Sequence, residues 1–254
     1  CTPAPWRAGA RWSAGATTTG DRAVLLRSPR SERASVRPLP GEHGVRCWRI
    51  GDRVLERARS ERSYRQLLAV AEQVWPALDG CPVLLDRDDE ARTITRTWHE
   101  GEPGRAPLDR AVELVGSLHA LPCPDPDLLP PREALSRRRA AAAAVVPDEL
   151  AARALELDLD ALGPLRRCWC HRDLRPGNLL GPEPLLIDWE HARPDVALMD
   201  LAKWPELAQG VGVSTQAYRV VRALHGLQTR AWGERTGDLR YRDMGQRLLE
   251  RILA

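Results

Sequence analysis

The hydrophobic and polar positions of the chain follow two different patterns before and after about residue 100. The first part has short runs suited to strands, at residues 45–50, 53–57, 83–85 and 93–98, and apolar and polar residues alternate in the first of them. Alternation with a period of two is typical of half-buried β-strands. A Gly-Asp turn joins the first two runs, so we expect a hairpin there and an antiparallel sheet overall.

One helix interrupts these strands, at residues 60–78. Ser60 is a candidate N-cap, because its hydroxyl can accept from the first free backbone N–H groups. An apolar stripe at helical spacing follows, formed by Tyr64, Leu67, Leu68, Ala71, Val74 and Trp75.

The second part is mostly helical in pattern. Amphipathic stretches are found at residues 108–121, 132–146, 147–162, 218–232 and 241–253, with a proline-rich linker at 121–131. A small antiparallel sheet followed by helices indicates an α+β fold.

A polar stretch between the two helical regions carries the candidate chemistry. It reads CWCHRDLRPGNLLGPEPLLIDWE and contains Asp173, Asn178 five positions later, and Asp188 within an apolar run. Residues 167–170 form a candidate strand, and two apolar runs around Gly-Pro-Glu-Pro form a candidate hairpin. This hairpin would return Asp188 close to Asn178.

These residue types suit phosphoryl transfer from ATP. Mg²⁺ prefers oxygen ligands, which Asn178 and Asp188 can supply, while Asp173 can accept the proton of an attacking hydroxyl. An isolated His-Arg-Asp is common, and a purely structural polar loop is the alternative. The additional Asn and the apolar-Asp-Trp at this spacing favour a phosphotransfer site.

This stretch resembles the aminoglycoside phosphotransferase and choline kinase group, the small-molecule branch of the protein-kinase-like fold. The matching segments are HRDLRPGN at 171–178, IDWE at 187–190 and DLA at 200–202. Arg172 and Arg175 depart from the usual pattern towards the protein-kinase form.

The resemblance implies two lobes, with ATP and Mg²⁺ between them. We expect an N-terminal extension or hairpin at 1–35, a nucleotide-binding lobe at 36–100, and a mainly helical catalytic and substrate-binding lobe at 101–254. The implied reaction is phosphoryl transfer to a hydroxyl of a small molecule, either an antibiotic or a metabolite. Asp173 would act on the hydroxyl and Arg175 on the γ-phosphate, with His171 and Asp200 as structural supports.

The resemblance also indicates the nucleotide contacts. Gly41 and Gly44 precede a strand, as in the loop that covers the phosphates, although an ordinary hairpin tip explains them almost as well. Trp98, His99 and Glu100 occupy the place of the hinge that binds adenine through backbone groups.

The lysine expected on the third strand is missing, because the only lysine of the chain, Lys203, follows the catalytic stretch. Arg57 is the nearest substitute, with Arg59 and Arg53 as rivals, and Glu61 and Glu72 are candidate helix partners. Arginine keeps the charge, but its reach and geometry differ from those of lysine. A catalytically weak, pseudokinase-like binding protein is therefore one alternative, and a protein kinase is another.

Composition narrows the partners. A net charge of +3 and a pI of about 8.7 are too mild to indicate nucleic acid, and no apolar run is long enough for a membrane span. The six dispersed cysteines suggest reduced thiols in the cytosol. The segment 168–171 could be imagined as part of a zinc cluster, but no second Cys/His pair has metal-ligand spacing. Oligomeric state does not follow from the sequence.

The acceptor is weakly constrained. A site for polycationic aminoglycosides would need acidic residues, and the best candidates are Glu149, Glu156, Asp158 and Asp160, which ordinary helix-face charges explain equally well. The arginine run at 137–139 is best interpreted as a solvated helix face, with a site for an acidic ligand as the alternative.

Overall fold

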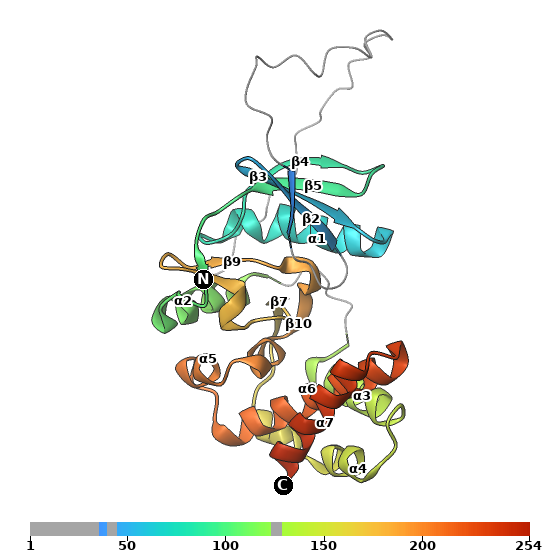
Figure 1. The fold of residues 1–254 in the computed structure, drawn as a ribbon. Coiled ribbons are helices and arrows are strands. Elements are labelled where there is room, and N and C mark those ends of the chain that lie inside the picture. Colours follow the sequence, from blue (N-terminus) through green and yellow to red (C-terminus); the bar gives the residue numbers. More distant parts are fainter. Residues whose placement is uncertain (1–35, 40–44, 123–128) are drawn as a thin grey trace, which may run out of the picture. The chain divides into compact units, whose positions relative to one another are not determined.

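The first half of the described chain contains a five-stranded antiparallel sheet in the order β1-β2-β3-β5-β4. The computed structural model describes residues 36–39, 45–122 and 129–254 (Figure 1). The strands are β1 (Val36–Leu39), β2 (Val45–Ile50), β3 (Arg53–Ala58), β4 (Leu84–Asp88) and β5 (Thr93–Thr97). The sequence pattern predicted all of these except β1.

Helix α1 (Glu61–Gln73) connects β3 to β4 and covers one face of the sheet (Figure 1). The hydroxyl of Ser60 accepts from the backbone N–H of Ser63, which confirms the predicted N-cap. The helix ends earlier than the pattern predicted, and a short 3-10 turn (Trp75–Ala77) follows. Pro76 explains this end, because proline disfavours helical backbone in the residue before it and lacks an N–H.

The two faces of the sheet differ sharply in exposure. Along β3, Val54, Glu56 and Ala58 are buried, whereas Arg53 and Arg57 are exposed. We call the face that carries Val54, Glu56 and Ala58 the inner face, and it belongs to the same side as α1, because Ala58 shares an apolar cluster with α1.

The second half of the described chain is mainly helical. Its helices are α2 (Leu108–Ala120), α3 (Pro131–Ala143), α4 (Glu149–Glu156), α5 (Pro205–Gly210), α6 (Thr215–Thr236) and α7 (Leu239–Leu253). The predicted helix at 147–162 is split, because a 3-10 turn (Leu159–Leu162) follows α4. None of the helices in the described ranges is long and apolar enough to cross a membrane.

Short strands in this half position the polar stretch. β7 (Arg167–Cys170) pairs with β10 (Arg193–Val196), and β8 (Leu179–Gly181) pairs with β9 (Leu185–Leu186) as the predicted hairpin. The polar stretch and the segment after it also contain three 3-10 segments, at Pro176–Asn178, Trp189–His191 and Ala197–Lys203.

The sheet half and the helical half are connected directly within one compact unit, residues 35–254. β6 (Glu102–Pro103), which follows β5, pairs with β8, and the N–H of Leu186 donates to the carbonyl of Gly80 at 2.8 Å. Gln66 on α1 donates to the carbonyl of Glu190 at 3.0 Å. The predicted α+β, kinase-like arrangement of an antiparallel sheet followed by a mainly helical part is confirmed.

Candidate active site

The polar stretch forms a loop between β7 and β8, and His171 lies at its buried end. The ring of His171 is fully buried, and its Nε2 donates to the carbonyl of Ile187 at 2.8 Å. Its Nδ1 accepts from the N–H of Asp173 at 3.3 Å. Burial lowers the pKa of His171, so the ring is neutral and acts as a spacer between the loop and the Asp188 segment.

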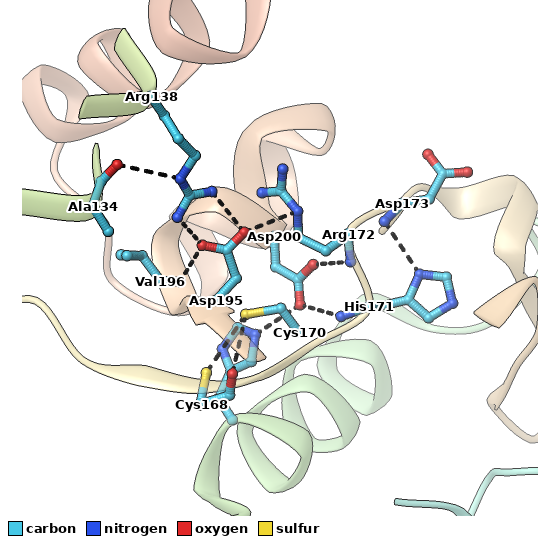
Figure 2. A network of polar contacts seen from close by, with 11 residues as sticks. Ala134, Arg138, Cys168, Cys170, His171, Arg172, Asp173, Asp195, Val196 and Asp200 are labelled. Atoms are coloured by element: carbon cyan, nitrogen blue, oxygen red, sulfur yellow. Dashed lines mark hydrogen bonds and ion pairs between the residues drawn. The ribbon is translucent and has the colours of Figure 1, made fainter. Parts of the chain in front are cut away.

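Asp200 holds the backbone of this loop. Its carboxylate accepts from the N–H groups of His171, at 2.8 Å, and Arg172, and from Nε2 of His119 at 3.0 Å (Figure 2). Arg172 has a φ of 69°, a left-handed conformation that costs energy for a residue with a side chain. The bonds to Asp200 offset this cost, so Asp200 supports the loop as expected from the sequence.

Arg172 itself points away from the loop and pairs with a buried acid. Its Nε lies 3.1 Å from Asp195 Oδ2, and Arg138 donates to the same carboxylate from both terminal nitrogens (Figure 2). Burial alone would raise the pKa of Asp195, but the two arginines outweigh it and lower the pKa to about 2. One member of the arginine run therefore fixes β10, while Arg172 has a structural role.

Asp173 is nearly buried and has three polar neighbours. Asn178 Nδ2 donates to its carbonyl and to its Oδ2, both at 2.8 Å, and Lys203 Nζ bonds to its Oδ1. Burial raises the pKa of Asp173, but Lys203, Arg175 and Asn178 together bring it below its ordinary value. Asp173 is consequently a carboxylate at neutral pH.

Asp188 lies opposite, directly after the β8–β9 hairpin. Its φ of 65° is again left-handed, which aspartate tolerates better than most residues. Its side chain is 42% exposed, and partial desolvation and then the charge of Asp173 raise the pKa of Asp188. The two carboxylates repel one another, which a cation between them would relieve.

Arg175 partly fulfils this need in the structure. Its Nε lies 3.3 Å from both Asp173 Oδ2 and Asn178 Oδ1, and its Nη2 lies 4.0 Å from Asp188 Oδ2. The structure thus brings together all four residues that were predicted from the polar stretch. Because Asn178 donates from its amide nitrogen to Asp173, its oxygen remains on the side of the cation, and the donor set fits Mg²⁺.

The arginine predicted to replace the missing lysine does not face this cluster. Arg57 is exposed on the outer face of the sheet, near Trp48 and Leu55. The inner face instead carries an ion pair in which Arg96 Nε donates to Glu56 Oε1 at 2.6 Å. Both side chains are almost fully buried, at about one tenth exposed.

The two predicted helix partners are engaged elsewhere. Glu61 pairs with Arg65 one turn further along α1, and Glu72 pairs with Arg87 of β4, all at least partly solvent-exposed. The buried acid next to a buried cation therefore comes from β3, and not from α1.

Electrostatic neighbours place the Glu56–Arg96 pair close to the catalytic loop. The charge of Glu56 contributes to the raised pKa of Asp188. Burial and then Arg96 lower the pKa of His99 after β5. Burial and then Glu56 raise the pKa of the Cys47 thiol on β2, which also senses Asp188. The charges of the pair therefore act on groups of β2, of the segment after β5 and of Asp188.

The residues predicted for the hinge form a cluster after β5. The guanidinium of Arg49 lies 4.3 Å from the ring centroid of Trp98, and Glu100 accepts from both Arg49, at 2.7 Å, and Trp98 Nε1, at 2.8 Å. His99 Nε2 lies 2.7 Å from the hydroxyl of Thr97. Gly41 and Gly44, predicted to cover phosphates, lie outside the described residues.

Three functional candidates were missed from the sequence: Glu56, Arg96 and Lys203. The burial of Glu56 could have been predicted, because residues two positions apart on a strand lie on the same face and Glu56 stands between Val54 and Ala58. The position of Arg96 depends on strand order, because β3 pairs with β5 and not with β4. Lys203 was set aside because it follows the catalytic stretch, yet the 3-10 segment after β10 returns it to Asp173.

The fold and the cluster define a kinase-like phosphotransferase class, and comparisons give the family. The model of the phosphotransferase enzyme family matches residues 16–235, so the chain belongs to this family. None of the curated proteins matches the chain.

Solved structures show the same fold at low identity. A point mutant of aminoglycoside 2'-phosphotransferase-IIIa in complex with GDP is 16% identical, with a TM-score of 0.68 over 88% of this chain and 93% of its own. A thermostable mutant of the aminoglycoside phosphotransferase APH(4)-Ia with ADP and hygromycin B is 15% identical, with a TM-score of 0.63 over 87% and 93%. A choline/ethanolamine kinase family protein from Mesorhizobium loti is 18% identical, with a TM-score of 0.56 over 86% of both chains.

Proposed function

We propose that the protein transfers the γ-phosphoryl group of ATP, with Mg²⁺, to a hydroxyl of a small molecule. The observation that carries the proposal is the grouping of Asp173, Asn178 and Asp188 around one position that suits a cation. Family membership supports phosphoryl transfer, and the ADP complex of a structural relative supports an adenine nucleotide as the donor.

Each residue of the cluster has a role that follows from its surroundings. Asp173 stays ionised and orients, or deprotonates, the acceptor hydroxyl. Asn178 and Asp188 would hold Mg²⁺, which neutralises charge on the phosphoryl group in this type of reaction. Arg175 is placed to contact the γ-phosphate once it leaves the carboxylates.

We further propose that Arg96 supplies the cation that a strand lysine supplies in other kinases. It is buried on the inner face, and Glu56 fixes its guanidinium at 2.6 Å. Arginine binds phosphate through a planar fork of donors, and a carboxylate partner orients that fork. Arg57 has neither the burial nor the location for this role.

The nucleotide base would lie at the segment after β5, with residues 36–100 as the nucleotide-binding part and 101–254 as the catalytic part. Trp98, His99 and Glu100 border that position. Arg49 covers one face of the Trp98 ring. A purine could therefore stack on that face only after Arg49 moves. Gly41 and Gly44 remain proposed as the loop over the phosphates.

The acceptor is proposed to be a neutral or anionic hydroxyl compound, and not a polycationic aminoglycoside. Lys203 and Arg175 both contact Asp173, so the immediate surroundings of the proposed base are cationic. Of the predicted acidic candidates, Asp158 caps its own 3-10 turn and Asp160 pairs with Arg132. Each of these two carboxylates therefore already has a partner in the structure.

We also place the reaction in the cytosol, because four described cysteines (Cys47, Cys81, Cys168 and Cys170) are free thiols.

The test separates an enzyme from a nucleotide-binding relative. We would screen the protein with ATP, Mg²⁺ and a panel of hydroxylated metabolites and antibiotics, and then repeat the positive reactions with Asp173→Asn. Loss of a general base lowers kcat by about 10²- to 10⁴-fold, and we expect ATP binding to persist. Nucleotide binding with no transfer to any acceptor would favour the pseudokinase-like alternative, and phosphate incorporated into proteins would favour a protein kinase.

A further inference from the structure

A second cluster of reactive side chains lies behind the catalytic loop. It consists of Cys168 and Cys170 on β7 and His119 on α2, and all three are buried. One ligand atom from each lies within 4.8 Å of the others. Figure 2 shows the two sulfurs facing one another beside Asp200. The proposed phosphotransfer reaction uses none of these three side chains.

The two sulfurs are closer than the strand alone requires. Residues two positions apart on a strand point to the same side and are roughly 6.6 Å apart along it. Cys168 Sγ and Cys170 Sγ, however, are only 3.7 Å apart. Two thiolates at about 2.3 Å from one tetrahedral zinc ion are separated by about 3.8 Å. The thiols therefore already have the spacing of a metal-bound pair.

Their surroundings differ from those of a cysteine that only fills the core. Cys81 belongs to the large apolar cluster, together with Leu78 and Leu114. Cys168 and Cys170 are fully buried, yet belong to none of the three apolar clusters among the described residues. His119 lies beside them, and Asp200 contacts His119.

His119 is held in a form that can bind a metal. Its Nε2 lies 3.0 Å from Asp200 Oδ2, and in the neutral ring that donates from Nε2 the Nδ1 atom carries a lone pair for a metal. Metal-binding histidines commonly donate their second ring nitrogen to a carboxylate, which fixes the tautomer and the ring orientation. Asp200 serves as such a carboxylate and also binds the N–H groups of His171 and Arg172.

We propose that His119, Cys168 and Cys170 form a binding site for Zn²⁺. Two thiolates and one imidazole are a ligand set that zinc prefers over Mg²⁺. On binding, the two thiols lose their protons and the ion links α2 to β7. Because Asp200 joins His119 to the catalytic loop, the ion would also stabilise the loop backbone. This site is independent of the proposed function.

The test is the metal content of the full-length protein, expressed with added zinc and purified under reducing conditions. We expect about one zinc per chain in the wild type and its loss in Cys170→Ser and in His119→Gln, each of which removes one ligand with little change in shape. Cys81→Ser is the matched control for loss of a buried thiol, and Asp188→Asn is the control for zinc at the catalytic loop. Both should keep the ion.

A second measurement covers variants that fail to fold. Replacing zinc by Co²⁺ in the wild type should give a thiolate-to-cobalt charge-transfer band, which reports sulfur ligands directly. Zinc that is absent from folded wild-type protein would overturn the proposal. A cobalt spectrum without the thiolate band would overturn it as well, and so would a zinc content that is equal in wild type, Cys170→Ser and His119→Gln.

Discussion

The two aspartates of the candidate active site are held in opposite electrostatic states. Lys203 and Arg175 stabilise the charge of Asp173, whereas burial and the neighbouring Asp173 disfavour the charge of Asp188. In the absence of a cation, Asp188 is therefore less favourable as a charged group than Asp173, although its side chain is 42% exposed. In a site of this kind, the charge that lowers the stability of the folded protein also strengthens the binding of a cation.

This imbalance predicts how Asp188→Asn changes stability with pH. The folded-state pKa of Asp188 is raised, so its penalty is absent below the ordinary aspartate pKa of about 3.9 and fully present above the folded-state pKa. We expect Asp188→Asn to melt at a higher temperature than wild type at pH 7, with the gap narrowing towards pH 4. Asparagine tolerates the left-handed backbone at this position. Equal melting curves at both pH values, without Mg²⁺ or nucleotide, would show that Asp188 carries no such penalty.

The assignment of Arg96 gives a second prediction at this scale. Removing Arg96 alone would leave Glu56 buried and unpaired, so the informative variant is Glu56→Met with Arg96→Met, which replaces the pair by apolar groups. We expect its ATP affinity to fall about 10- to 100-fold, the equivalent of one hydrogen bond to a charged group. Arg57→Met is the matched control and should bind ATP as wild type does. The reverse order of affinities, measured by calorimetry, would return the role to Arg57.

At this scale the sequence predicted the residues of the polar stretch but not the cation of the sheet. Asp173, Asn178 and Asp188 lie on one loop and one hairpin, so local spacing is enough to bring them together. Arg96 and Lys203 approach the site through strand order and a return of the chain, which local patterns do not specify.

Helices α6 and α7 pack against each other with their backbones in close contact at glycine positions. A Cβ added at Gly245 of α7 would lie 2.4 Å from the backbone nitrogen of Arg230 and 2.6 Å from the carbonyl oxygen of Gly226. A Cβ at Gly233 of α6 would lie 2.2 Å from the backbone nitrogen of Arg242. Backbone atoms cannot move aside as a flexible side chain can, so these glycines set the distance between the helices.

We therefore expect Gly245→Ala to destabilise the protein. Overpacking of this type costs roughly 1–3 kcal/mol. Gly116 of α2 is the matched control, because a Cβ added there would have no atom of the described residues within 4 Å. Gly116→Ala should stabilise the protein by up to about 1 kcal/mol, since alanine is the better helix former. Urea unfolding of both variants checks the pair, and a neutral Gly245→Ala would mean that the helices can separate freely.

The sequence pattern predicted most elements but placed several ends wrongly. The β8–β9 hairpin and the Ser60 cap follow from local residue types and are confirmed. The errors lie where apolar periodicity continues past the end of the helix, as at Trp75–Ala77 and Leu159–Leu162. Periodicity reports which residues are buried, and a 3-10 turn buries them just as a helix does.

On the scale of residues 35–254, the sheet half and the helical half meet where the proposed reaction takes place. The segment after β5 pairs with β8, which is one strand of the hairpin that precedes Asp188. Gly181 of β8 lies so close to the Arg105 backbone that an added Cβ would be 2.3 Å from it. From the sheet, the charge of Glu56 acts on Asp188. We therefore expect both halves to be needed for nucleotide binding.

The central claim is that this meeting point binds nucleotide through a cation held by Asp188. The most direct test is calorimetric titration of ATP into the full chain with and without Mg²⁺, for wild type and Asp188→Ala. We predict binding that is much tighter with Mg²⁺ and that loses this dependence in the variant. Binding unaffected by Mg²⁺ or by Asp188→Ala, or no binding by the folded wild type at any ATP concentration, would contradict the assignment.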